Sequence, residues 1–335
     1  MALMLASRVC RASTLSKTTV FVKQPNTITV YRAFSEGKDA AARTARRQVG
    51  IKEKLMQPAG DTAFRMGRGA LAGASALGIG ALAFYGLGLS SEASALEKQH
   101  LWPQYVKDRI KTTYMYFGSS IAITAASALA AVRSPAIMRL VMANGFMGFA
   151  ISLAAIMGTG ILCQSIPYSE GFGSKQLAWM LHAGTMGAMI APLCFLGGPL
   201  LIRAAWYTAG VVGGLSTIAV CAPSEKFLYM GGPLAMGLGV VFVSSIGSVF
   251  LPPTTALGAG LYSISLYGGL ILFSGFLLYD TQRIIAQAER YPANPDALGI
   301  RPYDPINASI GIYLDTLNIF IRIATILAGG GQKRK

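Results

Sequence analysis

The sequence is short of charge, and this shortage excludes a water-soluble globule. Only 13% of the 335 residues are Asp, Glu, Lys or Arg, whereas 53% are hydrophobic. A soluble domain carries roughly 25% charged residues, because its surface must face water. A lipid bilayer solvates apolar side chains directly, so the composition predicts an integral membrane protein.

Metal ligands and catalytic motifs are also scarce. Four widely separated cysteines form no disulfide framework, and the two histidines, His100 and His182, are too isolated to build a transition-metal site. There is no phosphate-binding glycine loop or nucleophile constellation. An intramembrane aspartyl protease would need Gly-x-Gly-Asp where this chain has Ile312-Tyr313-Leu314-Asp315. We therefore expect no enzyme and no resident cofactor. Because no basic and aromatic stripe occurs, we also expect no nucleic-acid partner.

The positive charge is concentrated at the N-terminus. Residues 1–68 hold 13 Lys or Arg against four acids, a net +9 of the total +15. Residues 1–35 carry no acid and are rich in Ser and Thr, which is typical of a mitochondrial transit peptide. Arg32-Ala33-Phe34-Ser35 resembles a matrix-protease site, so we expect cleavage near Phe34 and Ser35 and removal of residues 1–34. The alternative is a disordered basic tail.

Long uncharged runs predict eight transmembrane helices, because a helix that crosses the hydrocarbon core needs about 20 apolar residues. Pro252-Pro253 divides the longest run into two spans. The eight predicted spans are Gly69–Ser91, Thr112–Val132, Leu140–Cys163, Gln176–Gly197, Ala204–Pro223, 228–251, 257–280 and Ile306–Ala328. A polar basic segment (35–68) and a basic tail (329–335) flank them. Eight spans place both termini on one side, but the loop charges do not decide which side.

Two aspartates stand inside predicted spans, where an ionisable group costs about 2.5–3.5 kcal/mol and usually marks a polar pathway. If the seventh helix continues to Arg290 before Pro292, Asp280 lies about 15 Å from its end. Asp315 lies at a similar distance along the eighth helix. The polar loop 291–304 would join the two as antiparallel neighbours, so we expect both carboxyl groups at matching depth.

Two carboxylates that meet in a low dielectric cannot easily both ionise, so such a pair shares a proton. It could exchange protons for a cation, and oxygen ligands suit calcium. With Asn318 or Thr281 nearby, the pair still falls short of six to eight oxygen ligands, which predicts weak binding. Arg283, one turn after the first aspartate, and Arg322, two turns after the second, are candidate supporting residues. The alternative is a structural role, with each aspartate bound to an arginine or capping a loop.

Two motifs carry a resemblance to a known family. Tyr279-Asp280-Thr281-Gln282-Arg283-Ile284-Ile285 and Ile312-Tyr313-Leu314-Asp315-Thr316-Leu317-Asn318-Ile319-Phe320 resemble the last two helices of the transmembrane Bax inhibitor motif family. Ser244–Phe250 and Ala204–Cys221 resemble its middle helices. The resemblance covers about residues 105–330. It implies an all-α, polytopic membrane protein with a seven-helix core (105–328), in which six helices surround a central final helix, and with one extra helix at 69–91.

The resemblance also implies a function. Members of the family suggest a pH-sensitive calcium leak or calcium/proton exchange through the paired aspartates, with calcium and protons as transported ions, and roles in cell survival. With the transit peptide, this predicts a multi-pass protein of the mitochondrial inner membrane that supports cristae organisation. Expected partners are the lipid bilayer and inner-membrane proteins, including proteases and cristae components. The alternative is a non-transporting scaffold, which is favoured by the extra helix and the 35–68 segment.

The sequence departs from the family pattern at two places that concern gating. Some relatives carry an acid in the third core helix, whereas Gly187–Gly197 has none. Bacterial relatives latch the aspartates with an arginine in the second core helix, whereas Leu140–Cys163 contains none and only Arg139 precedes it. The family's gating details therefore do not carry over to this chain.

Overall fold

The computed structural model describes residues 56–331, apart from 59, 88, 91–93, 144–145 and 224. These residues belong to one compact unit, Met56–Lys335. The predicted transit peptide (1–34), its cleavage site at Phe34 and Ser35, and most of the predicted tail (329–335) lie outside the described residues.

Eight helices of the described chain are long and apolar enough to cross a membrane, and no strand occurs among the described residues. This confirms the predicted all-α, polytopic architecture. The spans are α3 (Thr62–Gly86), α5 (Gln104–Val132), α7 (Phe146–Ser165), α8 (Ser174–Ile190) with η2 (Ala191–Leu196), α9 (Gly198–Cys221), η3 (Leu228–Met230) with α10 (Gly231–Phe250), α11 (Ala256–Ser263) with η4 (Ile264–Gly268) and α12 (Gly269–Arg290), and α13 (Pro305–Gly331). Short helices connect them: α4 (Ala95–Lys98), η1 (Gln99–Leu101), α6 (Pro135–Val141) and η5 (Asp296–Leu298).

Four of the described spans begin six or more residues from their predicted starts: α3, α5, α7 and α9 begin at residues 62, 104, 146 and 198 rather than 69, 112, 140 and 204. The extra helix α3 begins at Thr62 rather than residue 69, because Arg65 and Arg68 in its first turns are exposed and can reach the membrane interface. The predicted span Leu140–Cys163 was wrong at its start, since α6 ends at Val141 and α7 begins at Phe146. The intervening sequence contains Asn-Gly, a dipeptide that marks turns.

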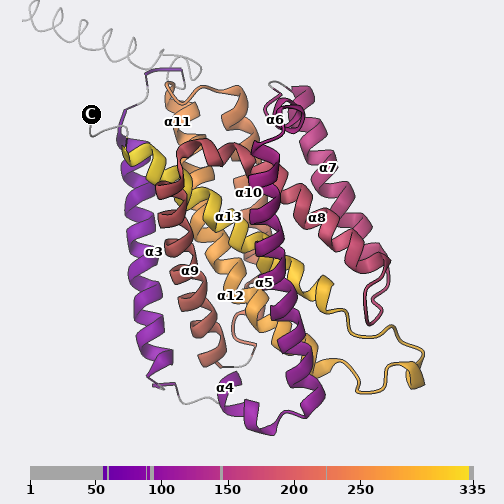
Figure 1. Cartoon of the computed structure of the whole chain (residues 1–335). Helices are drawn as coiled ribbons and strands as arrows, with labels where there is room; N and C mark the ends of the chain where they lie inside the picture. Colours follow the sequence, from indigo (N-terminus) through magenta and orange to yellow (C-terminus); the bar gives the residue numbers. More distant parts are fainter. Residues whose placement is uncertain are drawn as a thin grey trace, which may run out of the picture. The chain divides into compact units, whose positions relative to one another are not determined.

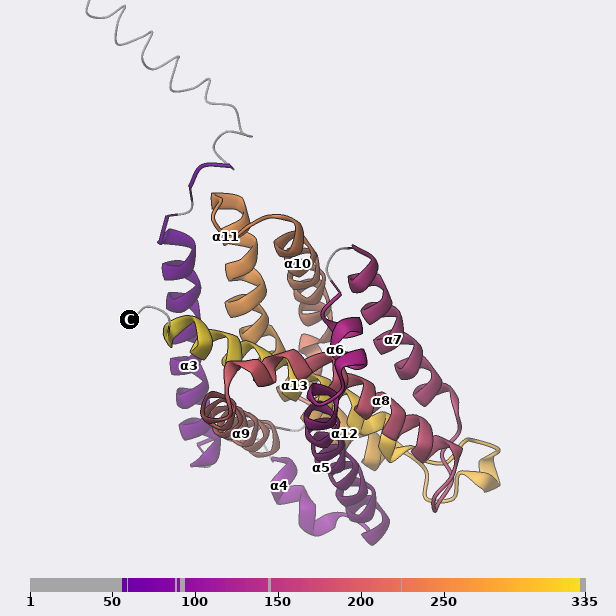
Figure 2. The ribbon, with the colours of Figure 1, turned by 45° about the horizontal axis from the view of Figure 1, so that its top comes forward.

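The final helix α13 is the most buried span. Half of its membrane window is buried inside the protein, whereas none of the window of α3 is. It contacts α5, α9 and α12, and it reaches α8 where Ile306 and Ile310 pack against Trp179. Figures 1 and 2 show α13, in yellow, crossing the bundle with other helices on both sides. The central final helix that the resemblance implied is therefore present.

The two ends of the bundle can be named from α12 and α13. The loop 291–304 between them lies at one end, together with the first residues of α5, and we call this the loop end (Figure 1). The helix α13 finishes at the opposite end, near the start of α3, and we call this the tail end (Figure 1).

The helices α11, η4 and α12 form one continuous span of 35 residues, Ala256–Arg290. At 1.5 Å per residue it is about 50 Å long, whereas the hydrocarbon core is about 30 Å thick, so its ends project toward the headgroups. Its η4 segment is a π-helical turn, where the regular hydrogen-bond ladder is interrupted. The extra helix is attached beside this turn, since Ser263 Oγ donates to the carbonyl oxygen of Ala63 at 2.8 Å.

Candidate ion-binding site

Asp280 on α12 and Asp315 on α13 meet inside the bundle. The two residues are 7% and 5% exposed respectively, and their carboxyl groups are within hydrogen-bonding contact of each other. The contact follows from local sequence: α12 continues to Arg290, and α13 begins at Pro305, a residue favoured in the first turn of a helix. Antiparallel pairing of these two helices thus places both acids at the same depth.

Gly311 makes this contact sterically possible. It lies one turn before Asp315 on the same face of α13. A Cβ atom at position 311 would stand only 2.8 Å from Cγ of Asp280, a distance at which something must shift. The carboxyl group of Asp280 therefore enters a gap that only glycine leaves open. Sequence reasoning missed this residue, although its one-turn spacing from an intramembrane aspartate was visible.

The arrangement of the two acids favours a shared proton. Asp315 Oδ2 is buried, and no hydroxyl, amide or guanidinium group of the described chain donates a hydrogen bond to it. Two ionised carboxylates in contact would repel each other strongly in the low dielectric of the bundle. A hydrogen bond between two carboxyl groups needs one proton, so in such a bond one of the two acids is protonated.

Arg283 is the predicted supporting residue that contacts the pair. Its Nη1 lies 3.6 Å from Oδ1 of Asp280, and its side chain is 52% exposed. It stands three residues after Asp280 and seven before the end of α12, so it lies on the loop-end side of the acids. Arg283 thus links the buried pair to the surface near that end.

Asn318 and Arg322 bind each other rather than the aspartates. Nη1 of Arg322 donates to Oδ1 of Asn318 at 2.8 Å, and Nε of Arg322 donates to the carbonyl oxygen of Ser265 at 3.1 Å. Thr281, considered as a calcium ligand, instead donates to the carbonyl oxygen of Leu277 at 2.7 Å. The site therefore offers a cation two carboxyl groups but neither the Asn318 nor the Thr281 side chain as the structure stands.

No group of three or more His, Cys, Asp or Glu side chains that could hold a metal occurs in the described part of the chain. Two carboxyl groups supply fewer oxygens than the six to eight of a tight calcium site. Water molecules would have to complete the shell of a bound calcium ion. This donor set fits a cation that binds weakly and leaves again.

Two cationic side chains, Lys175 and Arg109, hold the loop end, and the sequence analysis predicted a role for neither of them. Lys175 is fully buried, and its Nζ lies 2.8 Å from Asp304 Oδ2 and 2.7 Å from Asn307 Oδ1. Arg109 donates to the carbonyl oxygens of Tyr291 at 2.8 Å and Pro292 at 2.7 Å. In the sequence both look like ordinary charges that flank apolar runs. They fix the loop that joins the two aspartate-bearing helices.

Tyr303 completes this anchoring in the loop. Its hydroxyl lies 3.0 Å from Oγ1 of Thr113 on α5, and its ring faces the guanidinium of Arg109 at 5.5 Å. Burial raises the pKa of the Tyr303 phenol, although the hydrogen bond to Thr113 and the charge of Arg109 oppose this. Tyr303 therefore stays a neutral hydrogen-bonding group around neutral pH.

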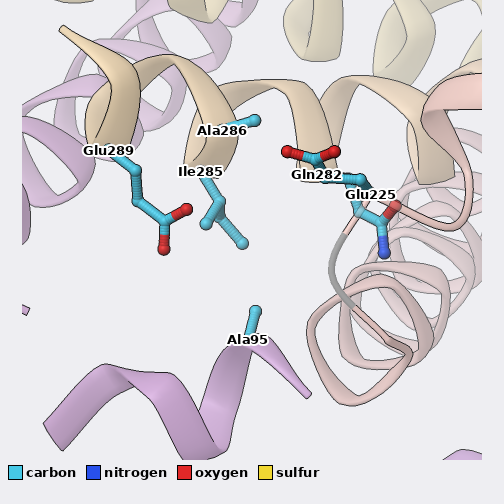
Figure 3. A pocket seen from close by; sticks show the side chains of 6 residues that line it. All are labelled: Ala95, Glu225, Gln282, Ile285, Ala286 and Glu289. Carbon is cyan, nitrogen blue, oxygen red and sulfur yellow. The ribbon is translucent and has the colours of Figure 1, made fainter. Parts of the chain in front are cut away.

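A pocket beside α12 lies apart from the acid pair. Figure 3 shows α12 above and Ala95 of α4 below, with the pocket between them. It is lined by Ala95, Glu225, Gln282, Ile285, Ala286 and Glu289. Its four α12 residues face away from Asp280, because they lie about half a helical turn around from it. Its two acids are occupied: Glu225 pairs with Arg290, and Glu289 accepts a hydrogen bond from Trp102.

Comparisons with known proteins agree with this architecture. The family described as "Inhibitor of apoptosis-promoting Bax1" matches residues 106–333, which covers the seven spans from α5 to α13. The chain is 52% identical to the growth hormone-inducible transmembrane protein of Rattus norvegicus, over 99% of this chain and 97% of that protein.

More distant relatives match a smaller share of the chain. Identity to Bax inhibitor 1 of Rattus norvegicus is 28%, over 72% of this chain and 93% of that protein. Identity to an uncharacterized membrane protein of Vibrio cholerae is 29%, over 65% and 87%. The helix α3 precedes the family match, whereas the alignment to the growth hormone-inducible protein spans almost the whole chain. The chain therefore belongs to the Bax inhibitor family, as a multi-pass membrane protein related to growth hormone-inducible transmembrane protein.

Proposed function

We propose that the protein is a cation pathway of the mitochondrial inner membrane, in which the pair of Asp280 and Asp315 exchanges protons for calcium. The observation that carries this proposal is the contact of two buried carboxyl groups on neighbouring helices of a membrane bundle. A structural role would be served better by an acid whose oxygens are all hydrogen-bonded, but no hydroxyl, amide or guanidinium group of the described chain donates to Asp315 Oδ2.

The exchange follows from competition for the same oxygens. When the shared proton leaves, two negative charges in contact attract a divalent cation strongly, because the low dielectric of the bundle barely screens them. When protons return, the carboxyl groups lose charge and release the cation. Binding of calcium thus expels protons, and acidification expels calcium.

The mitochondrial location rests on the cationic, acid-free residues 1–35. A part in cell survival is supported by the description of the matched family, which names inhibition of apoptosis-promoting Bax1. In this account calcium and protons are transported ions, and no residue has a catalytic role.

Calcium flux in liposomes tests the proposal. The purified protein is reconstituted, a pH gradient is imposed, and calcium uptake is recorded with a trapped dye. Asp315→Asn removes one of the two charges and is expected to abolish uptake. Glu170→Gln is the matched control, because Glu170 is an exposed acid in the α7–α8 loop, away from the pair. Unchanged uptake in Asp315→Asn would refute the ion-pathway assignment.

A second function, a scaffold for inner-membrane proteins such as proteases or cristae components, is favoured by α3. None of the membrane window of α3 is buried inside the protein, and an ion pathway does not need this helix. Deleting residues 35–91 separates the two functions. Loss of bound partners in pull-downs with retained calcium flux would assign the scaffold role to this segment, whereas unchanged partner binding would contradict it.

A further inference from the structure

Polar and small residues form a stripe along one face of α13. Gly311, Asp315, Asn318 and Arg322 are spaced by four, three and four residues, which keeps them on one side of a helix. Arg322 lies seven residues after Asp315, about 10.5 Å further along the axis toward the tail end. The acid pair thus has Arg283 on its loop-end side and Arg322 on its tail-end side.

In the part of the chain that the structure describes, neutral groups hold Arg322. Its Nε donates to the carbonyl oxygen of Ser265, its Nη1 donates to Asn318, and its guanidinium lies 4.6 Å from the centre of the Phe273 ring. No carboxylate of the described chain lies within ion-pair distance of it. The guanidinium is therefore a positive charge with no ion-pair partner among the described residues.

The π-helical turn η4 and Gly269 form the site that holds the guanidinium of Arg322. Ser265 belongs to η4, where the interrupted ladder makes its carbonyl oxygen available to Arg322. A Cβ atom at Gly269 would lie 2.8 Å from Cζ of Arg322, so an added methyl group would displace the guanidinium from this position. The η4 turn and Gly269, which both belong to the span Ala256–Arg290, thus position the guanidinium of Arg322.

Polar groups continue beyond Arg322. The hydroxyl of Ser265 lies 2.7 Å from the hydroxyl of Ser245 on α10, and Ser248 Oγ donates to the carbonyl oxygen of Ser245 at 2.7 Å. Since α10 ends at Phe250, this series leads toward the tail end. Arg322 therefore stands between the acid pair and a series of hydroxyl groups on that side.

We propose that Arg322 closes the tail-end side of the pathway and thereby prevents cations from leaking through it. A cation that leaves the pair along the α13 stripe meets a fixed positive charge in a low dielectric, where repulsion is strong. Arg283 does not form such a barrier, because its side chain is half exposed and beside Asp280. The pathway opens on the tail-end side when the guanidinium leaves Ser265 and Asn318. This inference rests on the proposed function.

Leak measurements test the proposal. Calcium-loaded liposomes without a pH gradient report uncoupled efflux. Arg322→Gln keeps a hydrogen-bond donor but loses the charge, and the leak is expected to rise about tenfold, the effect of removing a barrier of about 1.4 kcal/mol. Arg322→Lys keeps the charge and should stay near the wild-type leak. Arg203→Gln, an exposed arginine on α9, is the matched control and should leave the leak unchanged.

Two further variants show where the leak passes and guard against misfolding. Gly269→Ala retains Arg322 but displaces its guanidinium, so its leak should also rise. Combining Arg322→Gln with Asp315→Asn should remove the leak, because the ions pass the acid pair. A leak that persists in this double variant overturns the proposal. A wild-type leak in both Arg322→Gln and Gly269→Ala overturns it as well, and if Asp315→Asn still abolishes coupled uptake, the proposed function survives that failure.

Discussion

At the scale of single residues, the contact between the two aspartates depends on a missing side chain. Asp280 occupies space on α13 that a Cβ atom at Gly311 would fill. The aspartates themselves were predictable, because charge inside an apolar run is conspicuous. The role of Gly311 was not predictable, because the chain has 39 glycines and their spacing alone does not reveal which of them faces an acid.

Gly311→Ala tests this dependence. The added methyl group should push the carboxyl group of Asp280 away from Asp315, reduce calcium flux severely, and destabilise the protein by about 1–3 kcal/mol through overpacking. Gly329→Ala on the same helix is the control, because its Cβ would meet nothing within 4 Å. Calcium flux and thermal unfolding in detergent measure both effects. Equal flux in the two variants would show that the contact does not matter for transport.

At the scale of elements, prolines made the aspartate-bearing helices predictable. Pro292 and Pro305 bound the loop, so the end of α12 and the start of α13 followed from sequence. The π-helical turn η4 could not be predicted from the sequence, because residues 264–268 contain neither proline nor charge. The roles of Lys175 and Arg109 also escaped prediction, since a flanking charge looks the same whether it faces lipid headgroups or a loop carbonyl.

The anchoring of the α12–α13 loop can be tested at Lys175. Lys175→Met leaves Asp304, Asn307 and two backbone carbonyl oxygens without their donor. Breaking a buried pair costs about 3–5 kcal/mol, and the partial exposure of Asp304 places the expected loss near the lower limit. Arg301→Gln, an exposed change in the same loop, should be neutral. Similar unfolding midpoints for the two variants would contradict the anchoring role.

At the scale of the whole molecule, the number of spans was predictable because each needs about 20 apolar residues regardless of packing. Hydropathy does not reveal which span lies in the middle of the bundle. The membrane windows of α13 and α7 have the same mean hydropathy, 1.6, yet 50% of the first and 17% of the second is buried. The central position of α13 came from the family resemblance. The transit peptide remains a prediction from composition, since it lies outside the described residues.

The N-terminus of the chain purified from mitochondria tests the predicted transit peptide. Mass spectrometry of the mature chain should find an N-terminus near Ser35. Arg32→Ala removes the arginine that precedes the predicted site and should leave an uncleaved or differently cleaved chain, whereas Lys23→Ala should be processed normally. Recovery of the intact N-terminal peptide from imported wild-type protein would show that residues 1–34 are not removed.

The most direct measurement of the central claim records calcium and proton movement together in liposomes that contain the purified chain. Calcium entry should be accompanied by proton exit, acidification of the side that supplies calcium should slow both, and Asp280→Asn and Asp315→Asn should each stop both. Calcium entry without proton movement, or coupled movement that survives either substitution, would contradict an exchange carried by this pair of acids.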